Sequence, residues 1–281
     1  MTIKETLRKG IIELKINNIQ EPSLKARLLL QYILNKPRQY LIIYDNKQLT
    51  LRQEVNFFKG IKKLVKGIPL QHITHSQEFM KMTFYVNEDV LIPRPDTEIL
   101  VEEVIKIAKR INAKKILDLC TGSGAIAVSL AKYIENSQIT AVDISTKAIS
   151  VAKLNAKNNN VENQITFVES DLFKELPKEK YDIIVSNPPY IKKEIIKSLD
   201  KEVQNEPKIA LDGGYDGLDF YRKIINNADE FLKFKGYVCL EIGYDQKDDV
   251  LELFESKGKY VEATCKKDLF DNDRVVIARL N

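Results

Sequence analysis

The sequence has 281 residues, 44% of them hydrophobic and 30% charged, with a net charge of +4. This length exceeds a typical single domain of roughly 100 to 200 residues, and the hydrophobic fraction is enough to bury a substantial core, so we expect two domains. No apolar run approaches the roughly 18 residues that span a bilayer and no signal peptide is recognisable, which excludes a membrane partner and predicts a cytoplasmic protein.

The charge is unevenly distributed along the chain. Residues 1–85 carry 15 Lys and Arg against 6 Asp and Glu, a balance of +9, whereas the remainder has a balance of −5. A basic module can steer a polyanionic partner such as RNA or an acidic protein, although a lysine-rich solvated surface gives the same count. The three cysteines, Cys120, Cys239 and Cys265, contain no C-x-x-C pair, which predicts reduced thiols and no zinc knuckle.

Helical spacing of apolar residues dominates the first part of the chain, up to Lys66, and we predict a helical domain over residues 1–74. His72 and His75 are three residues apart, but they lack the further ligands that a metal site requires. After Pro69 the pattern alternates as in a β-hairpin, whose predicted turn is at residues 87–89 and whose second strand is at 90–92. This hairpin is the predicted linker, residues 75–94.

Strands and helices alternate over residues 95–281, after a first helix that Asp96 or Thr97 can cap. Further helices are predicted at residues 125–133, 146–158 and 218–234, and strands at residues 115–119, 138–144, 165–169, 181–186, 236–242, 260–265 and 274–280. This alternation is typical of an α/β fold with a doubly wound, mostly parallel Rossmann-like sheet.

The first strand of this domain leads into a glycine-containing loop, Asp118–Gly124. Gly122 and Gly124 allow a sharp turn at the edge where open α/β sheets bind cofactors, and Asp143 ends the second strand, where a carboxylate can accept from ribose hydroxyls. With Ala127 the glycines also satisfy the dinucleotide pattern G-x-G-x-x-G/A. Asp118 favours another ligand, because a carboxylate there repels a pyrophosphate but can pair with the ammonium group of S-adenosylmethionine.

A third loop follows the third strand and contains Asp171, Leu172 and Phe173. Asp171 can accept a hydrogen bond from an adenine amino group, and the apolar pair can cover the ring. A simple turn or helix cap is the alternative for Asp171, as a loop cap is for Asp118.

The tetrapeptide Asn187-Pro188-Pro189-Tyr190 follows the fourth strand. The prolines fix the backbone and donate no hydrogen bond, so the Asn187 side-chain oxygen and the Pro188 carbonyl form a rigid pair of acceptors for a planar NH₂ group, on which Tyr190 can stack. The nitrogen of an amide or nucleobase NH₂ is a poor nucleophile. Positioning, which can contribute up to roughly 7 to 11 kcal/mol, is therefore expected to supply most of the rate, and no strong base is evident.

The second part of the chain resembles class I methyltransferases, and nearly the whole sequence is similar to the release factor N(5)-glutamine methyltransferase family. The likeness rests on the order of seven motifs, Ile92–Glu98, Asp118–Ala127, Ala141–Ser145, Val185–Ile191, Glu206-Pro207, Leu211–Leu218 and Leu240–Gly243. It implies transfer of a methyl group from S-adenosylmethionine, with S-adenosylhomocysteine as product and no metal, to the glutamine amide nitrogen in the Gly-Gly-Gln loop of peptide chain release factors. It also implies that the helical domain docks the release factor; we expect a monomer without a stable nucleic acid partner.

The resemblance distributes roles among the residues of these motifs. The cofactor residues are expected to be Asp118, Cys120, Thr121, Gly122, Ser123, Gly124, Asp143, Asp171, Leu172 and Asn187. Asn187 and Tyr190 are the expected catalytic residues, and the substrate site is expected to contain Asn187, Pro188, Pro189, Tyr190, Arg94 and Glu98. For Arg94 and Glu98, a purely structural role at the domain junction is an equally good interpretation.

The sequence departs from the commonest family pattern at three positions. Cys120 stands where glycine is frequent, Leu172 where an aromatic residue often covers adenine, and His75 where glycine is usual. These departures bear on affinity. Cys120 is not expected to be a nucleophile, because the methyl group passes directly from sulfur to nitrogen and no base is paired with the thiol.

Three other functions compete with this interpretation. The strongest is a nucleic acid amino-methyltransferase acting on adenine or guanine, since the tetrapeptide suits an exocyclic NH₂ equally well; the basic part, however, has few aromatic residues arranged for base stacking. A nicotinamide-dependent dehydrogenase leaves Asp118 and the tetrapeptide without a role. A non-catalytic adaptor does not require Asp118, Asp143 and Asn187 together.

Overall fold

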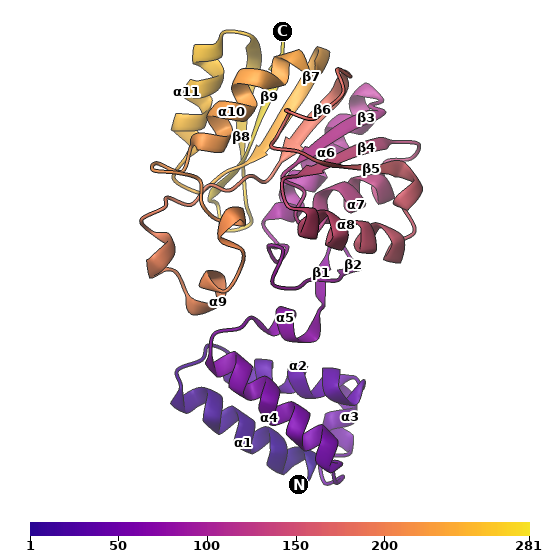
Figure 1. The fold of residues 1–281 in the computed structure, drawn as a ribbon, viewed down its shortest axis with the longest axis vertical. Helices are drawn as coiled ribbons and strands as arrows, with labels where there is room; N and C mark the ends of the chain where they lie inside the picture. Colours follow the sequence, from indigo (N-terminus) through magenta and orange to yellow (C-terminus); the bar gives the residue numbers. More distant parts are fainter. The chain divides into compact units, whose positions relative to one another are not determined.

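The computed structural model describes residues 1–281 and divides the chain into two compact units (Figure 1). The helical unit contains residues 1–76 and 200–205, and the sheet unit contains residues 77–199 and 206–281. The predicted boundaries, 1–74, 75–94 and 95–281, include no counterpart of the second segment of the helical unit. No helix is both long and apolar enough to cross a bilayer.

The helical unit is a small bundle whose helices begin at well-defined caps. Thr2 and Thr50 each form a capping box, with Glu5 and Gln53 respectively. The buried face of the bundle includes Phe57. The helices are α1 Ile3–Ile16, α2 Pro22–Leu34, α3 Arg38–Ile43, α4 Leu51–Val65, α5 Leu70–Thr74 and, from the second segment, α9 Lys201–Gln204.

Polar contacts hold the second segment within the helical unit. Lys25 of α2 forms an ion pair with Glu202 of α9. The Asn205 side-chain amide donates to the backbone oxygen of Gly67 at 3.0 Å. Each of these contacts joins residues that are far apart in sequence, so no local sequence pattern predicts it.

The sheet unit confirms the predicted α/β fold. Its seven-stranded sheet has the order β5-β4-β3-β6-β7-β9-β8, in which β9 is antiparallel to both of its neighbours and the other pairs are parallel. The strands are β3 Lys115–Leu119, β4 Gln138–Asp143, β5 Ile165–Glu169, β6 Tyr181–Ser186, β7 Leu232–Glu241, β8 Tyr260–Lys267 and β9 Asp273–Leu280. The order reverses between β3 and β6, and such a switch point is where open α/β sheets bind ligands.

Two hydrophobic cores lie between the sheet and its helices (Figure 1). One core joins the sheet to α6 Thr97–Ile111, α7 Ala125–Tyr133 and α8 Thr146–Asn158, and the other joins it to α10 Asp219–Asn227 and α11 Lys247–Lys257. Apolar side chains on both faces explain the nearly continuous hydrophobic runs of the central strands.

The hairpin and one helix differ from their predicted positions. The hairpin consists of β1 Gln77–Phe79 and β2 Met82–Phe84, and its turn is at Met80 and Lys81, both with positive φ. Residues 87–89 do form a turn, closed by a hydrogen bond from the N–H of Val90 to the oxygen of Asn87 at 3.3 Å, but this turn does not join the two strands of the hairpin as predicted. Residues 90–92 are not a strand; Val90 and Ile92 pack against α8 instead. The predicted helix at 218–234 is too long, because β7 begins at Leu232.

Candidate active site

The loop between β3 and α7 has the left-handed backbone that its glycines suggested. φ is 60° at Cys120, 55° at Gly122 and 79° at Gly124. A side chain at Gly124 would place its Cβ 3.0 Å from Ala152, so this glycine allows α7 to begin close against α8. A Cβ at Gly122 would meet no atom within 4 Å, so only backbone conformation requires glycine there.

Asp118 ends up completely buried beneath this loop. Its Oδ2 accepts a hydrogen bond from Thr121 Oγ1 at 2.6 Å, while Oδ1 has no hydrogen-bond partner. Burial raises the pKa of Asp118 to about 7. A buried acceptor without a donor is unfavourable. Asp118 therefore suits a ligand that brings a positive charge or N–H donors, as an ammonium group does.

Asp143, at the end of β4, ties the first two loops together. Its Oδ2 accepts from the backbone N–H of Gly122 and its Oδ1 from that of Ser145, both at 2.9 Å. Burial raises the pKa of Asp143, and these hydrogen bonds oppose the rise. Each oxygen keeps lone pairs that can accept from ligand hydroxyls.

The loop after β5 is held by its own polar groups. Ser170 Oγ donates to the backbone oxygen of Leu172 and accepts from the N–H of Glu175, both at 3.0 Å. Asp171 forms an ion pair with Lys174. Leu172 has a positive φ of 54° and is buried.

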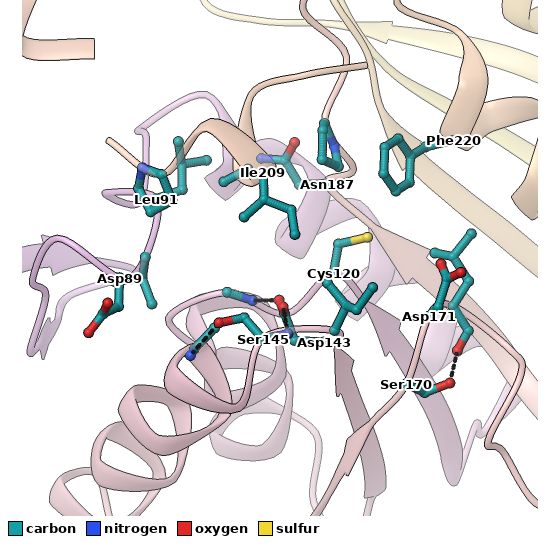
Figure 2. Close-up of a pocket in the computed structure, with 18 residues that line it drawn as sticks. Asp89, Leu91, Cys120, Asp143, Ser145, Ser170, Asp171, Asn187, Ile209 and Phe220 are labelled. Atoms are coloured by element: carbon teal, nitrogen blue, oxygen red, sulfur yellow. Dashed lines mark hydrogen bonds between the residues drawn. The ribbon is translucent and has the colours of Figure 1, made fainter. Parts of the chain in front are cut away.

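These loops surround a cavity in the sheet unit (Figure 2). In Figure 2, Asn187 and Phe220 lie across the cavity from Asp143 and Ser145. The lining residues are Asp89, Val90, Leu91, Cys120, Gly122, Asp143, Ile144, Ser145, Ala148, Ser170, Asp171, Leu172, Asn187, Pro189, Pro207, Ile209, Ala210 and Phe220. The cavity is therefore mostly apolar, with the carboxylate of Asp143 across from the amide of Asn187.

Asn187 lies where β6 ends, and its side chain is anchored at one end only. Its Nδ2 donates to Thr97 Oγ1 at 3.2 Å. Thr97 is the first residue of α6 and is buried. This contact engages the amide nitrogen of Asn187 and leaves its oxygen as the group that can accept from a ligand.

The glycine loop at residues 211–218 packs tightly against the tetrapeptide that Asn187 begins. A Cβ at Gly213 would lie 2.7 Å from Cα of Tyr190 and 2.9 Å from the oxygen of Pro189. Ile191 accepts a backbone hydrogen bond from Gly213 at 2.9 Å. The absence of a side chain at Gly213 is thus what allows this loop to brace the tetrapeptide.

Tyr190 points its hydroxyl toward Glu241, the last residue of β7, at 3.4 Å. Glu241 is buried and Tyr190 is half-buried, and burial raises the pKa of each, that of Glu241 to about 7. Tyr190 does not line the cavity and packs on the core that contains α10 and α11. Its carbonyl oxygen accepts from Gln246 at 3.0 Å.

Arg94 and Glu98 are engaged within the sheet unit and do not line the cavity. Arg94 forms an ion pair with the buried Glu206, which also accepts from the backbone N–H of Ile92 at 2.9 Å. Glu98 accepts from the N–H of Met80 at 2.6 Å. Glu206 immediately precedes Pro207, a residue of the cavity wall, so Arg94 acts on the wall through Glu206.

The structure brings six of the ten expected cofactor residues to the cavity: Cys120, Gly122, Asp143, Asp171, Leu172 and Asn187. Asp118, Thr121, Ser123 and Gly124 lie in the loop behind its surface, and Pro189 is the one further substrate residue in the wall. Burial raises the pKa of Cys120, which keeps it a neutral thiol. No group of three or more His, Cys, Asp or Glu side chains could hold a metal ion.

Three supporting residues were not found from the sequence: Asn155, Gln246 and Thr97 as a partner of Asn187. Asn155 is fully buried in α8 and bonds the backbone of Tyr85 and the oxygen of Ser123. Its position within the apolar stripe of a helix is the sequence feature that indicates a buried, hydrogen-bonded side chain. For Gln246 the sequence offers no comparable sign.

Comparison with known proteins agrees with this geometry. Residues 5–74 match the family described as PrmC N-terminal domain, and residues 95–214 match the Methyltransferase small domain. The release factor glutamine methyltransferase of Clostridium acetobutylicum is 42% identical over 99% of this chain and 98% of its own, and that of Clostridium botulinum is 38% identical over 99% of both.

A solved structure shares the fold of the sheet unit. The 16S rRNA N2 G1207 methyltransferase of T. thermophilus, determined with AdoMet and guanosine, has a TM-score of 0.52 at 18% identity, covering 73% of this chain and 50% of its own. The sheet order, the glycine loop and the acidic residues around the cavity thus define a Rossmann-like, S-adenosylmethionine-dependent methyltransferase. Within that class, the chain belongs to the release factor glutamine methyltransferase family.

Proposed function

We propose that this protein transfers the methyl group of S-adenosylmethionine to the side-chain amide nitrogen of the glutamine in the Gly-Gly-Gln loop of peptide chain release factors. Asn187 carries the proposal: it lines the cavity with its nitrogen bonded to Thr97 and its oxygen available. The near full-length relatives named for this activity support the choice of acceptor.

The residues around the cavity fit the cofactor. At the cavity surface, Asp143 suits the ribose hydroxyls and Leu172 offers an apolar surface for adenine. Behind that surface, the buried carboxyl of Asp118 suits the ammonium group. When bound, S-adenosylmethionine supplies a methyl carbon whose bond to sulfur breaks as its bond to nitrogen forms, with the electron pair left on sulfur.

The chain contributes positioning to this reaction. We assign the Asn187 oxygen and the Pro188 carbonyl to the two N–H groups of the glutamine amide, which aims the nitrogen lone pair at the methyl carbon. Tyr190 is held by Glu241 at its hydroxyl and by Gln246 at its carbonyl oxygen, so we assign it the role of a positioning residue that stiffens this acceptor pair. The amide nitrogen then loses one proton to water.

The helical unit is proposed to dock the release factor. A groove on this unit has an apolar floor and a rim with five cations and one anion. Its lining is Lys4, Leu7, Arg8, Ile11, Ile12, Lys15, Arg27, Arg38, Leu41, Ile42 and Asp45. Such a surface suits a protein face with apolar side chains edged by carboxylates. We expect the enzyme to act as a cytoplasmic monomer without a stable nucleic acid partner.

The experiment that tests the function is transfer of label from methyl-labelled S-adenosylmethionine to a purified release factor. We expect labelling of the wild-type factor and none after its loop glutamine is replaced by alanine. Labelling that persists in the alanine variant would identify another acceptor. RNA and DNA added in parallel test the alternative of an adenine or guanine amino-methyltransferase, which requires labelled nucleic acid.

A further inference from the structure

The turn between β8 and β9, residues 268–272, displays two apolar side chains to solvent. Leu269 is 95% exposed and Phe270 is 83% exposed, which makes Leu269 the most exposed large hydrophobic residue of the chain. Neither side chain belongs to the hydrophobic cores of the sheet unit. Single exposed apolar residues are common on protein surfaces, but an adjacent pair exposed to this degree indicates an interaction surface.

The β8–β9 turn is held in one conformation by Asp268, whose side chain is buried. Its Oδ1 accepts from the backbone N–H groups of Phe270 and Asn272, both at 2.9 Å. Its Oδ2 accepts from Arg274 Nη2 at 3.1 Å and from Asn272 Nδ2 at 3.2 Å. The Asp268 N–H donates to the Asn272 oxygen at 2.8 Å and closes the turn. The backbone that presents Leu269 and Phe270 is therefore fixed before any partner arrives.

The β8–β9 turn lies at the edge of the sheet that carries the acceptor site. β7 is parallel to β6, so both strands end at the carboxyl edge, where Asn187 follows β6. β9 runs antiparallel to β7, and Val275, near its start, pairs with Glu241, the last residue of β7. The turn that precedes β9 therefore projects from the same edge as Asn187.

Arg274 connects this turn to the residues around Asn187. Besides binding the turn, its buried guanidinium donates to the backbone oxygen of Ile242, directly after β7, at 3.2 Å. It also lies 3.6 Å from a carboxylate oxygen of Asp96, the N-cap of α6. The next residue, Thr97, accepts from Asn187 Nδ2. One buried side chain thus fixes the turn relative to the helix that positions Asn187.

We propose that Leu269 and Phe270 are a docking contact for the protein substrate, next to the site that receives its glutamine. The inference rests on the proposed function, since the occupant is the release factor. A glutamine that reaches Asn187 is part of a folded protein, so the surface around its loop lies against this edge of the sheet unit. A preformed pair of apolar side chains loses little conformational entropy on binding, which suits a partner with a shallow apolar surface beside its glutamine loop.

The Kd of the release factor, measured by calorimetry with saturating S-adenosylhomocysteine, tests the proposal without requiring methyl transfer. We expect Phe270→Ser to raise this Kd by about fivefold and the double variant Leu269→Ser, Phe270→Ser by about tenfold or more, because truncation of apolar anchors weakens interfaces by such factors. The Kd for S-adenosylhomocysteine should change by less than about twofold. Leu269→Met combined with Phe270→Tyr keeps the apolar surface and should bind the factor within about threefold of wild type.

Phe234→Ser is the matched control for Phe270→Ser. Phe234 is 75% exposed and lies near the start of β7, at the opposite, amino edge of the sheet. All of these substitutions change exposed side chains, so urea unfolding should give wild-type midpoints and separate docking from folding. An unchanged Kd in the double variant, or equal weakening by Phe234→Ser and Phe270→Ser, overturns the proposal.

A second copy of this chain is the other occupant that an exposed apolar turn can accept. Light scattering of the wild type and of the double variant distinguishes the two occupants. A wild-type dimer that the double variant dissociates overturns the proposal, whereas monomers of both leave the substrate protein as the occupant. The weakening by the double variant should also be equal at low and high salt, because no charge is removed.

Binding and labelling separate this inference from the proposed function. A release factor that binds the wild type more tightly than the double variant but is never labelled would sink the proposed function alone. A release factor that is labelled and binds both proteins equally would sink this inference alone. A wild type that neither binds nor labels the factor would sink both.

Discussion

A side-chain amide offers one oxygen that accepts and one nitrogen that donates, so the value of Asn187 to an acceptor NH₂ depends on which end faces the cavity. Asn187→Ala removes both ends. We expect turnover to fall by at least about a hundredfold, because the acceptor nitrogen is no longer aimed. Kd for S-adenosylhomocysteine, measured by calorimetry, should change by less than about threefold. Parallel loss of turnover and cofactor binding would instead make Asn187 a cofactor residue.

The pKa of Asp118 predicts that cofactor affinity depends on pH. Its pKa of about 7 means that the carboxylate an ammonium group requires is fully formed only above that pH. S-adenosylhomocysteine should therefore bind roughly five- to tenfold more tightly at pH 7.5 than at pH 6. Asp118→Asn should bind more weakly and lose this dependence, whereas Glu241→Gln should keep it. A pH-independent Kd in the wild type would argue against the pairing.

At the scale of elements, one added methyl group can test whether the glycine loop at residues 211–218 holds the tetrapeptide in place. Gly213→Ala would place a Cβ within 3 Å of Tyr190 and Pro189, both backbone contacts that cannot yield without moving the tetrapeptide. We expect kcat to drop by about tenfold or more at nearly unchanged cofactor affinity, since displacement of a positioning group by about 1 Å can have a hundredfold effect. Gly258→Ala is the control for kcat, because a Cβ there meets no atom within 4 Å. The φ of 66° at Gly258 makes alanine unfavourable there, so thermal unfolding of both variants separates the loss of stability from the loss of kcat.

Much of the element pattern was predictable because the central strands are buried on both faces and read as continuous apolar runs. The motif order placed the cavity residues as well, since strand ends of a parallel sheet meet at one edge. Other features depend on tertiary contacts. The α9 segment is short and polar, and Met80-Lys81 does not resemble the Asn-Gly pairs that usually mark a two-residue hairpin turn.

Cys120 shows that the requirement for glycine at a motif position can depend on a backbone angle that cannot be predicted from sequence. Its φ of 60° lies in the left-handed region, which explains why glycine suits this position. The Thr97 hydroxyl is a similar case, since its partner Asn187 is far away along the chain.

At the scale of the whole molecule, the groove on the helical unit predicts a charge-dependent affinity for the substrate protein. Arg8→Glu should raise KM for the release factor severalfold, more at low than at high salt, with kcat unchanged. Lys9→Glu is the matched control: it makes the same charge change on the neighbouring exposed residue, which does not line the groove. Equal effects of both variants would indicate general steering by net charge.

Global stability should also depend on pH through the two buried carboxyl groups. Asp118 and Glu241 have raised pKa values of about 7, so the folded state holds protons that the unfolded chain releases near pH 4. Their contribution is complete below about pH 4 and is lost as the pH rises through 7. We expect the free energy of unfolding in urea to fall by a few kcal/mol between pH 5.5 and pH 8. Asp118→Asn combined with Glu241→Gln should flatten this slope; an unchanged slope would contradict the assignment.

The return of the chain to the helical unit at residues 200–205 makes that unit discontinuous. A fragment ending at Ser76 would lack Glu202 and Asn205, the partners of Lys25 and Gly67. No single cleavage of the backbone can therefore release both units intact, and a protease that cuts once between them leaves one of the two incomplete. Shuffling the amino-terminal module between relatives would accordingly need two crossover points, the second just before the glutamate that Arg94 binds.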